Sequence, residues 1–555
     1  MQYRRIVTLS LVALVTMLVV APQPVAQALP AGPVTVRVGY GDDAELAWLA
    51  REDGDVWAID ADARECTLMT NAAGIEELVA RGYEVAVTAN AAPEIPACYR
   101  TIVQLYADAA AFETQYPGLV QVSDVGDSWD KVMAGGPAGF DMVMLRLTNE
   151  AIAGPKPRFF TDGGMHAREL PTSELVMEYA EYLLTNYGTN AEVTALLDYS
   201  EVYLGVNSNP DGHLENEINS SYWRKNMDND DGCSGNYGVD LNRNQDFKWG
   251  CCGGSSGYAC DETYRGPSPA SEPEIQAYEA AVRGLFPDQR GPNDGDVAPI
   301  TTTGILISYH NYAAEMLYPW GWTTNASPNA ADLRALAVRY TSHSNRYAVS
   351  TSLYTVDGNT RDWAYGELGI PAYVIELDSD DFYASCSLLP GIINENVPAL
   401  FNITKMADQP YLRIHGPQAN EAIQVSVSGA QATITATVTF AWTGCATYDP
   451  CTNPFSQNVG AAELYIDTPP VRGGTPIAMQ AVDGSFNSAT EQVRVTTDIS
   501  GLASGQHLVF VRGRGVNSYQ ALETWGPVTA AFMDVTSTFD YWNYLPLHVL
   551  NAIQP

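Results

Sequence analysis

The chain has 555 residues, of which 65 are acidic and 29 are basic, so its formal net charge at pH 7 is −36. A field of that sign repels phosphate backbones and anionic lipid surfaces, so neither nucleic acid nor an anionic membrane is an expected partner. The length predicts several domains.

The N-terminal residues 1–28 have the three parts of a secretory signal peptide. Arg4 and Arg5 precede an apolar stretch at 6–20, and the small residues of Ala-Gln-Ala at 26–28 offer a cleavage site at the end of the segment. The apolar stretch has about 15 residues, fewer than the ~20 of a membrane-spanning helix, so a membrane anchor is the weaker alternative. No later segment of the sequence is long enough to span a bilayer either. We therefore expect a secreted, extracellular protein.

Residues 29–97 are predicted to form a small α+β domain. Its elements are expected in the order strand, helix, strand, strand, helix, strand, at residues 34–38, 44–51, 56–59, 66–69, 74–81 and 83–87. That order is typical of the ferredoxin-like fold.

A corner between a strand and a helix holds the first candidate site residues. A buried strand at 157–162 is followed by a Gly-Gly turn and a helix at 171–187. His166 and Glu169 lie at the corner, and their i, i+3 spacing lets both side chains reach one divalent metal ion. The His-x-x-Glu sequence alone is a weak signal, so its meaning depends on the residues that accompany it.

Two later strands bring further candidates to the same sheet. The strand at 305–309 delivers His310 at its carboxyl end, the edge where open α/β sheets place their ligands. The strand at 372–377 carries Glu376 inside an otherwise apolar run, where an unpaired charge would be costly. His310 is therefore a candidate third metal ligand, and Glu376 is a candidate functional carboxylate.

Four motifs, in one order along the chain, resemble those of the zinc carboxypeptidase A family. They lie at residues 166–169, 240–244, 308–312 and 374–377, and the resemblance spans 98–408. It implies an α/β catalytic domain built on a mixed sheet. It also implies that His166, Glu169 and His310 hold one Zn²⁺, because a His₂Glu set is the catalytic zinc site of carboxypeptidase A.

The resemblance implies roles for the residues around the metal. Glu376 would act as general base and general acid, taking a proton from the attacking water and passing it to the leaving amine. Asn242 and Arg243 would bind the C-terminal carboxylate of a peptide or protein, since a guanidinium is a matched two-pronged donor. Tyr354, which lies 22 residues before Glu376, would cap the substrate, and Arg168 would polarise the carbonyl or contact the substrate backbone.

One position departs from the family's pattern. Family members usually carry an Arg four residues after the Trp of a Trp-Arg-Lys sequence, where it stabilises the tetrahedral oxyanion, but here Met227 follows Trp223 at that distance. Loss of such a donor lowers the reaction rate by about 10²–10³-fold unless zinc, Arg168 or a repositioned Arg224 compensates. The departure leaves open a second interpretation, a catalytically silent peptide-binding protein at a surface.

Arg361 is the candidate determinant of substrate choice. Its position relative to the following Asp-Trp pair resembles the floor of the pocket that receives the C-terminal side chain, where a guanidinium favours acidic residues. Alternatively, Arg361 turns toward Asp362, Asp378 or solvent, because ion-paired surface arginines are common. An amidase of cell-wall peptides with the same metal set also stays open, in which the pocket would hold a D-amino acid or diaminopimelate.

The small domain at 29–97 resembles the inhibitory propeptide of the family, which would be cut near residues 90–98. A permanent accessory domain is the alternative, because no dibasic cleavage site marks the junction.

Nine cysteines in an exported chain imply disulfides and one unpaired thiol. Three pairings are expected, the first from the family resemblance: Cys233 with Cys260, Cys445 with Cys451, and Cys66 with Cys98. The adjacent Cys251 and Cys252, together with Cys386, leave the pairing open.

Residues 409–535 have the pattern of a β-sandwich, immunoglobulin-like in its strand spacing. Apolar residues alternate with Thr and Ala at 434–442, and further short apolar segments recur between Gly, Pro, Asp and Ser turns. No catalytic constellation is visible there, so spacing, stability, or contact with a polymer or surface are its candidate roles. The tail at 536–555 is a docking segment or a strand with a frayed end.

The sequence as a whole predicts a secreted zinc metallocarboxypeptidase made as a precursor. Its predicted parts are a signal peptide (1–28), a propeptide-like α+β domain (29–97), an α/β catalytic domain (98–408), a β-sandwich (409–535) and a tail (536–555).

Overall fold

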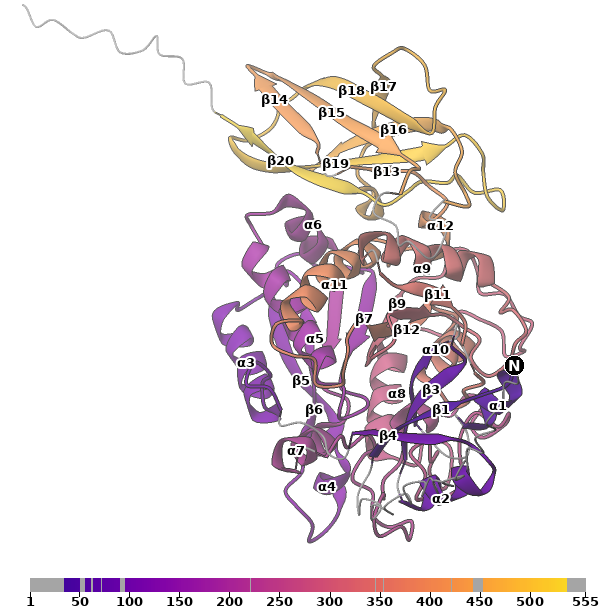
Figure 1. The fold of residues 1–555 in the computed structure, drawn as a ribbon. Coiled ribbons are helices and arrows are strands. Elements are labelled where there is room, and N and C mark those ends of the chain that lie inside the picture. The colour runs from indigo at the N-terminus through magenta and orange to yellow at the C-terminus, as the bar shows by residue number, and fades with distance from the viewer. Residues whose placement is uncertain are drawn as a thin grey trace, which may run out of the picture.

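The computed structural model describes residues 34–49, 55–60, 63–70, 72–89, 95–219, 221–344, 346–352, 354–420, 422–442 and 453–536. Three units follow one another along the chain: a small α+β unit, a large α/β unit and an all-β unit (Figure 1). The predicted signal peptide, nearly all of the predicted tail, and Cys445 with Cys451 lie outside the described residues.

The N-terminal unit is an antiparallel four-stranded sheet with two helices. Its elements are β1 (Val34–Gly39), α1 (Asp43–Trp48), β2 (Asp55–Asp60), β3 (Glu65–Thr70), α2 (Ala72–Ala80) and β4 (Val85–Ala89). The strand order is β2-β3-β1-β4, and Val36, Val38, Leu68 and Leu78 are buried between sheet and helices. The elements therefore occur in the order that the sequence predicts.

The central unit is built on an eight-stranded mixed sheet, as predicted. Its strands are β5 (Val120–Asp127), β6 (Asp141–Leu147), β7 (Arg158–Asp162), β8 (Glu201–Gly205), β9 (Ile305–Asn311), β10 (Glu315–Leu317), β11 (Ala348–Ser350) and β12 (Ala372–Leu377). They lie in the order β11-β10-β12-β9-β7-β8-β6-β5. The four strands β12, β9, β7 and β8 are parallel. Their carboxyl ends therefore meet at one edge, where α/β sheets bind ligands.

Helices cover this sheet. They are α3 (Ile102–Gln115), α4 (Trp129–Val132), α5 (Leu170–Asn186), α6 (Ala191–Tyr199), α7 (Pro210–Asn219), α8 (Pro273–Leu285), α9 (Ala330–Ser344), α10 (Thr360–Leu368), α11 (Leu389–Thr404) and α12 (Pro410–Arg413). Helix α5 packs on β7, β8 and β9 and against α11, while α10 packs on β9 and β12. Strand β9 is buried along its whole length, which gives the site a rigid base.

The C-terminal unit contains eight antiparallel strands. They are β13 (Gln418–Ala419), β14 (Gln424–Ser428), β15 (Gln431–Thr439), β16 (Val459–Ile466), β17 (Ile477–Ala481), β18 (Thr490–Asp498), β19 (Gly505–Gly515) and β20 (Thr529–Val535). Alternate residues of β15, from Ala432 to Val438, are buried against side chains of β16, β19 and β20. The arrangement is consistent with the predicted β-sandwich.

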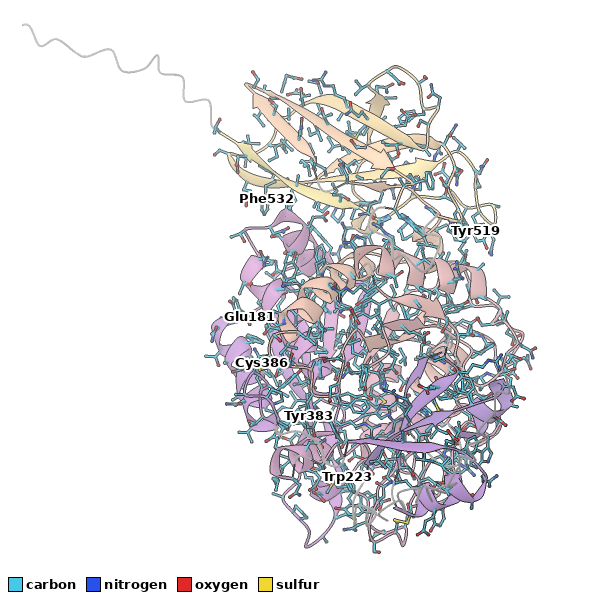
Figure 2. The ribbon with its side chains drawn as sticks, viewed as in Figure 1. Glu181, Trp223, Tyr383, Cys386, Tyr519 and Phe532 are labelled. Carbon is cyan, nitrogen blue, oxygen red and sulfur yellow. A yellow bond between two sulfur atoms is a disulfide. The ribbon has the colours of Figure 1, made fainter. Side chains whose placement is uncertain are left out.

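The all-β unit packs directly on the central unit, above α6, α9 and α12 (Figure 1). The Tyr199 hydroxyl donates to the Asp467 carbonyl at 2.6 Å. The ring of Tyr519, which lies at this junction in Figure 2, stacks on His415 at 3.7 Å between ring centroids. These contacts fix the orientation of the two units. Among the described residues, the helices lack the length and apolar character needed to cross a bilayer.

Candidate metal centre

The turn between β7 and α5 carries His166 and Glu169. Two glycines permit the turn to fold back on the helix. A Cβ atom on Gly163 would lie 2.6 Å from the Thr172 backbone, and Gly164 has a φ of +70°. Glycine alone accepts both conditions without strain. The turn thus places the two site residues at the carboxyl end of β7.

His310, in β9, completes a group of three buried side chains. Nδ1 of His166 lies 2.7 Å from Oε1 of Glu169 and 3.1 Å from Nδ1 of His310. Nδ1 of His310 lies 3.0 Å from Oε2 of Glu169. Together the three residues form a group that could hold a metal ion. The fold therefore brings the three predicted ligands to one point.

The donor set fits Zn²⁺. Ligand atoms about 2.0–2.2 Å from a tetrahedral zinc ion lie roughly 3.3 Å from one another. The separations of 2.7, 3.1 and 3.0 Å among the ring nitrogens and the carboxylate are close to that value. Two imidazole nitrogens that face each other in a buried site need a cation or a proton between them. Two imidazoles and one carboxylate also leave a zinc ion one open coordination position.

Asp240 orients the first of these histidines. Its Oδ1 lies 3.1 Å from Nε2 of His166, and its Oδ2 accepts hydrogen bonds from Nε and Nη2 of Arg224 at 3.2 and 2.8 Å. Burial favours the neutral acid, but Arg224, Arg243 and His166 hold the pKa of Asp240 well below its usual value. A carboxylate that accepts the Nε2 proton leaves Nδ1 of His166 free to bind a metal.

Glu376 lies beside the ligands because its strand is the neighbour of β9. Glu376 in β12 is in register with His310 in β9. Burial and the Glu169 carboxylate raise the pKa of Glu376 to about 8. A divalent cation bound by the three ligands would oppose that shift. Glu376 is thus a carboxylate next to the candidate metal site and lies outside the group of three residues that could hold the ion.

A cavity of about 110 Å³ opens beside the three ligands. Its walls contain the predicted substrate-binding residues Asn242, Arg243, Tyr354 and Arg361, together with Glu376. The fold thus brings these five residues to one cavity, although they come from segments far apart in the sequence.

Two hydrogen bonds fix the Arg243 guanidinium in the cavity wall. Nε donates to the Gly254 carbonyl at 3.1 Å, and Nη1 donates to the Asn242 carbonyl at 3.0 Å. The Asn242 side-chain oxygen accepts the Thr360 backbone N–H at 3.0 Å. A buried guanidinium held in this way is suited to bind a carboxylate.

Arg361 is buried in the cavity and is not turned to solvent, with 2% of its surface exposed. Its Nε lies 3.9 Å from the Asp362 carboxylate and donates no hydrogen bond. That carboxylate instead accepts the backbone N–H groups of Gly321 and Trp322. Arg361 is therefore a buried cation whose positive charge is only weakly neutralised by Asp362, its nearest acidic residue.

Arg168 does not line the cavity. Its guanidinium is fully buried, 4.2 Å below the ring of Phe382, and Nη1 lies 3.5 Å from Glu262. Phe382 itself forms part of the cavity wall. Arg168 therefore contacts a ring of the cavity wall and is not itself one of the residues that line the cavity.

The profile of the zinc carboxypeptidase family matches residues 105–399, more than half of the chain. The chain belongs to the zinc carboxypeptidase family. Carboxypeptidase A2 of Rattus norvegicus is 28% identical over 294 residues, which cover 51% of this chain and 64% of the rat protein. Carboxypeptidase B of Astacus astacus is 30% identical over 48% of this chain and 81% of its own length. The predicted family membership is confirmed.

Two solved structures share the fold. Carboxypeptidase A of Helicoverpa armigera has a TM-score of 0.56 and 19% identity over 68% of this chain and 98% of its own. Thrombin-activatable fibrinolysis inhibitor has a TM-score of 0.53 and 21% identity, and the match covers 68% of this chain and 99% of its own. The match to the rat and mouse carboxypeptidase A2 proteins spans 64% of their lengths.

The disulfides differ in part from the expected pairings. The Cys233–Cys260 bridge is present, and Cys251 is bonded to Cys252. The prediction that Cys66 pairs with Cys98 is wrong, because Cys98 is bonded to Cys386. Cys66 lies in the core of the N-terminal unit as a free thiol, and burial raises its pKa to about 12. No described disulfide therefore joins the N-terminal unit to the central unit.

From the sequence, Arg224 was only a candidate replacement for the missing oxyanion donor, and Glu315 had no assigned role. Arg224 reaches the candidate metal site because Asp240 holds its guanidinium. Glu315 lines the cavity in register with Glu376 across β10 and β12, and burial raises its pKa. In the sequence Glu315 follows Asn-Tyr-Ala-Ala, and nothing in that segment indicates that the Glu315 side chain lines a pocket.

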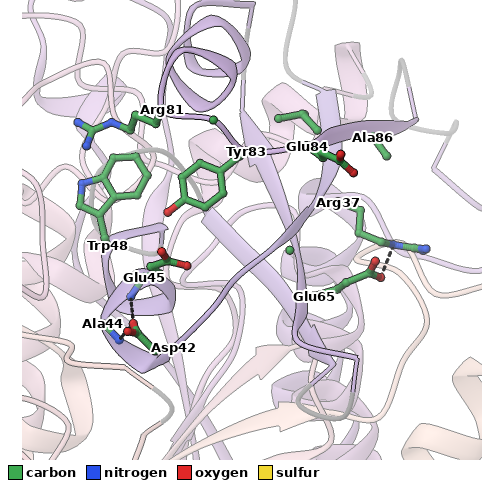
Figure 3. A pocket seen from close by; sticks show the side chains of 13 residues that line it. Arg37, Asp42, Ala44, Glu45, Trp48, Glu65, Arg81, Tyr83, Glu84 and Ala86 are labelled. Carbon is green, nitrogen blue, oxygen red and sulfur yellow. Dashed lines mark hydrogen bonds and ion pairs between the residues drawn. The ribbon is translucent and has the colours of Figure 1, made fainter.

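A separate hollow lies on the N-terminal unit. Figure 3 shows Trp48 and Tyr83 side by side in its wall, with ring centroids 5.9 Å apart and Arg81 above Trp48. Every residue that lines it belongs to the N-terminal unit. It is distinct from the metal centre of the family fold.

Proposed function

We propose that the chain is a secreted zinc metallocarboxypeptidase that removes single residues from the C termini of peptides or proteins. The observation that carries this proposal is the joint position of His166, Glu169 and His310 beside Glu376 in a cavity that Arg243 also lines. A metal site, a proton acceptor and a carboxylate-binding cation are the three parts that C-terminal hydrolysis requires.

His166, Glu169 and His310 would hold Zn²⁺, which, when bound, polarises a carbonyl and lowers the pKa of water. Glu376 takes the proton of the attacking water and gives it to the amine nitrogen as the carbon–nitrogen bond breaks. One carboxylate can serve both steps because the proton it accepts is the one it returns.

The C-terminal carboxylate of the substrate would bind to Arg243 and Asn242, whose positions the Gly254 carbonyl and the Thr360 backbone fix. Tyr354 would close over the bound residue. Arg168 would contact the substrate backbone only after a local rearrangement, because it packs on Phe382 and does not line the cavity.

Arg361 would make the enzyme favour acidic C-terminal residues. We expect Arg361→Gln to lower kcat/KM for a peptide ending in Glu by about 10–100-fold relative to one ending in Leu, the effect of a charge-assisted hydrogen bond. Hydrolysis rates on peptides that differ only in the last residue measure this ratio. Arg346→Gln, an exposed site, is the control. A wild-type preference for Leu over Glu would disprove the assignment.

One observation favours a second substrate class, the cell-wall peptide. The cavity contains Glu315 as well as Arg361, so it offers one anionic and one cationic partner. The diaminopimelate side chain carries both an ammonium and a carboxylate group, which matches that pair. Release of diaminopimelate from muropeptides, at a rate that falls in both Glu315→Gln and Arg361→Gln, would support this alternative.

The N-terminal unit would act as a propeptide that covers the cavity. Val56 of β2 is part of the cavity wall, so the N-terminal unit would obstruct the entry of a substrate C terminus. We expect cleavage near residues 90–98 to raise kcat/KM from near background to the full rate. The test compares the intact and trimmed proteins on one peptide. Equal rates would show that the unit is a permanent accessory domain.

The β-sandwich would contact a surface or polymer, or stabilise the central unit. Its apolar junction with α6, formed by Ala195, Tyr465, Phe510 and Ala530, favours stabilisation, because such a contact is costly to expose.

A further inference from the structure

Resting on the proposed function, we propose that Asp357 is a positioning residue for substrate binding. It holds the loop at 251–255, whose Gly254 carbonyl fixes Arg243, the anchor of the substrate's C-terminal carboxylate. Asp357 is fully buried, and it is not among the residues that line the cavity, so it would act on the substrate only through a neighbour. A buried carboxylate is costly unless hydrogen bonds satisfy its oxygens, so its partners show which segment it supports.

Three hydrogen bonds join Asp357 to this loop. The backbone N–H groups of Cys252 and Gly254 both donate to Oδ2 of Asp357 at 2.9 Å. The Ser255 hydroxyl donates to Oδ1. Hydrogen bonds to a carboxylate are stronger than those between neutral groups. Because all three donors belong to one short segment, the path of the loop depends on both oxygens of Asp357.

Gly254 links the loop to Arg243. Its carbonyl accepts Nε of Arg243 at 3.1 Å, one of the two hydrogen bonds that fix the guanidinium. A Cβ atom on Gly254 would lie 2.5 Å from the Asp357 backbone nitrogen, so only glycine allows the two main chains to approach this closely. A shift of the loop would therefore carry the Gly254 carbonyl away from the guanidinium.

The residue after Asp357 contacts Arg243 as well. The Gly358 carbonyl accepts the Gln245 backbone N–H at 3.0 Å, and a Cβ atom on Gly358 would lie 2.2 Å from the Arg243 carbonyl oxygen. Arg243 thus contacts Gly358 through its main chain and Gly254 through its side chain. Asp357 connects these two contacts, so its loss should displace the anchor.

A disulfide closes the exposed side of the same loop. Cys251 is bonded to Cys252, its neighbour in the sequence, and both residues are exposed. A crosslink restricts the conformations of the residues that it joins, and Cys252 is also a hydrogen-bond donor to Asp357. The disulfide on the exposed side and the carboxylate on the buried side therefore restrict one segment.

The test measures how strongly the protein prefers a free C terminus to an amidated one. Dissociation constants are measured for one peptide and its C-terminal amide in zinc-loaded, leader-trimmed Glu376→Gln protein, in which hydrolysis is expected to be suppressed. We expect this protein to prefer the acid, and Asp357→Asn in the same background to lower the preference by about 10-fold, because an asparagine NH₂ would face a donor of the loop. An unchanged preference, or an equal loss of affinity for both peptides, would overturn the proposal.

Turnover of protein with Glu376 intact gives a second readout. Asp357→Asn should raise KM for a peptide by about 10-fold and leave kcat within about threefold, because the anchor contributes binding that is the same in the ground state and the transition state. A fall in kcat with an unchanged KM would contradict the positioning role.

Two further variants keep the result interpretable. Asp294→Asn removes the same charge near the loop, where Asp294 pairs with Lys248 at 2.7 Å, and should keep the preference for the acid. An equal loss there would assign the effect to net charge and overturn the proposal. Cys251→Ser/Cys252→Ser changes only exposed side chains and should lower the preference in the same direction. If Asp357→Asn does not fold, an unchanged preference in this cysteine variant overturns the proposal.

One outcome concerns the proposed function itself. If the Glu376→Gln protein with Asp357 intact binds the acid and the amide equally, Arg243 is not the anchor of a terminal carboxylate. That result would refute the carboxypeptidase proposal and the role of Asp357 together, whereas a preference that survives Asp357→Asn would refute the role of Asp357 alone.

Discussion

Glu376→Gln is expected to lower kcat for C-terminal residue release by at least about 10²–10⁴-fold, the contribution of general acid–base catalysis, while stoichiometric zinc stays bound. Glutamine has nearly the same shape but can neither accept the water proton nor return it to the amine. Zinc binding should survive because Glu376 lies in β12 beside the ligands and is not part of the group that His166, Glu169 and His310 form.

Glu315→Gln is the matched control for this experiment. Glu315 lines the same cavity and is the antiparallel partner of Glu376 in the sheet, so the two substitutions remove the same charge from neighbouring positions. We expect Glu315→Gln to change substrate preference but to keep kcat near the wild-type value. Comparable losses in both variants would assign the effect to cavity charge and would contradict a proton-transfer role for Glu376.

His310→Ala is expected to abolish both stoichiometric zinc binding and turnover. The candidate site offers three protein ligands, and removing one would leave two, which is below the number found in catalytic zinc sites. The ring is fully buried in β9, so no other described side chain can move into its place without disturbing the core. Metal content and rate measured on the same sample check this expectation, with His166→Ala and Glu169→Ala expected to behave alike.

His507→Ala serves as the histidine control, since His507 lies in the all-β unit and pairs with Asp467 at 2.7 Å. It should retain zinc and full activity. Full zinc occupancy in His310→Ala, Glu169→Ala and His166→Ala would show that the metal is bound elsewhere and would refute the site assignment.

Local sequence patterns predicted the strands and helices that carry the candidate site residues. The strand expected at 372–377 is β12 (Ala372–Leu377), and the helix expected at 171–187 is α5 (Leu170–Asn186). Both signals are short-range, because apolar spacing and a Gly-Gly turn report on neighbouring residues. His166 and Glu169 share one turn, so their approach follows from the same local signal.

Contacts between distant segments were not predictable in the same way. The Cys98–Cys386 bridge joins residues separated by 288 positions, and no local pattern distinguishes Cys386 from Cys66 as the partner. The position of Arg224 depends on Asp240, and that of Glu315 depends on the pairing of β10 with β12. Each is a property of the tertiary structure, which one sequence alone leaves undetermined.

The most direct test of the proposed function is single-residue release from peptides that differ only at the C terminus, measured on leader-trimmed protein with a zinc chelator and after zinc is restored. We predict release that the chelator abolishes and zinc restores, fastest for peptides ending in Glu. Absence of release from leader-trimmed protein that contains stoichiometric zinc would contradict the carboxypeptidase assignment and favour a peptide-binding role.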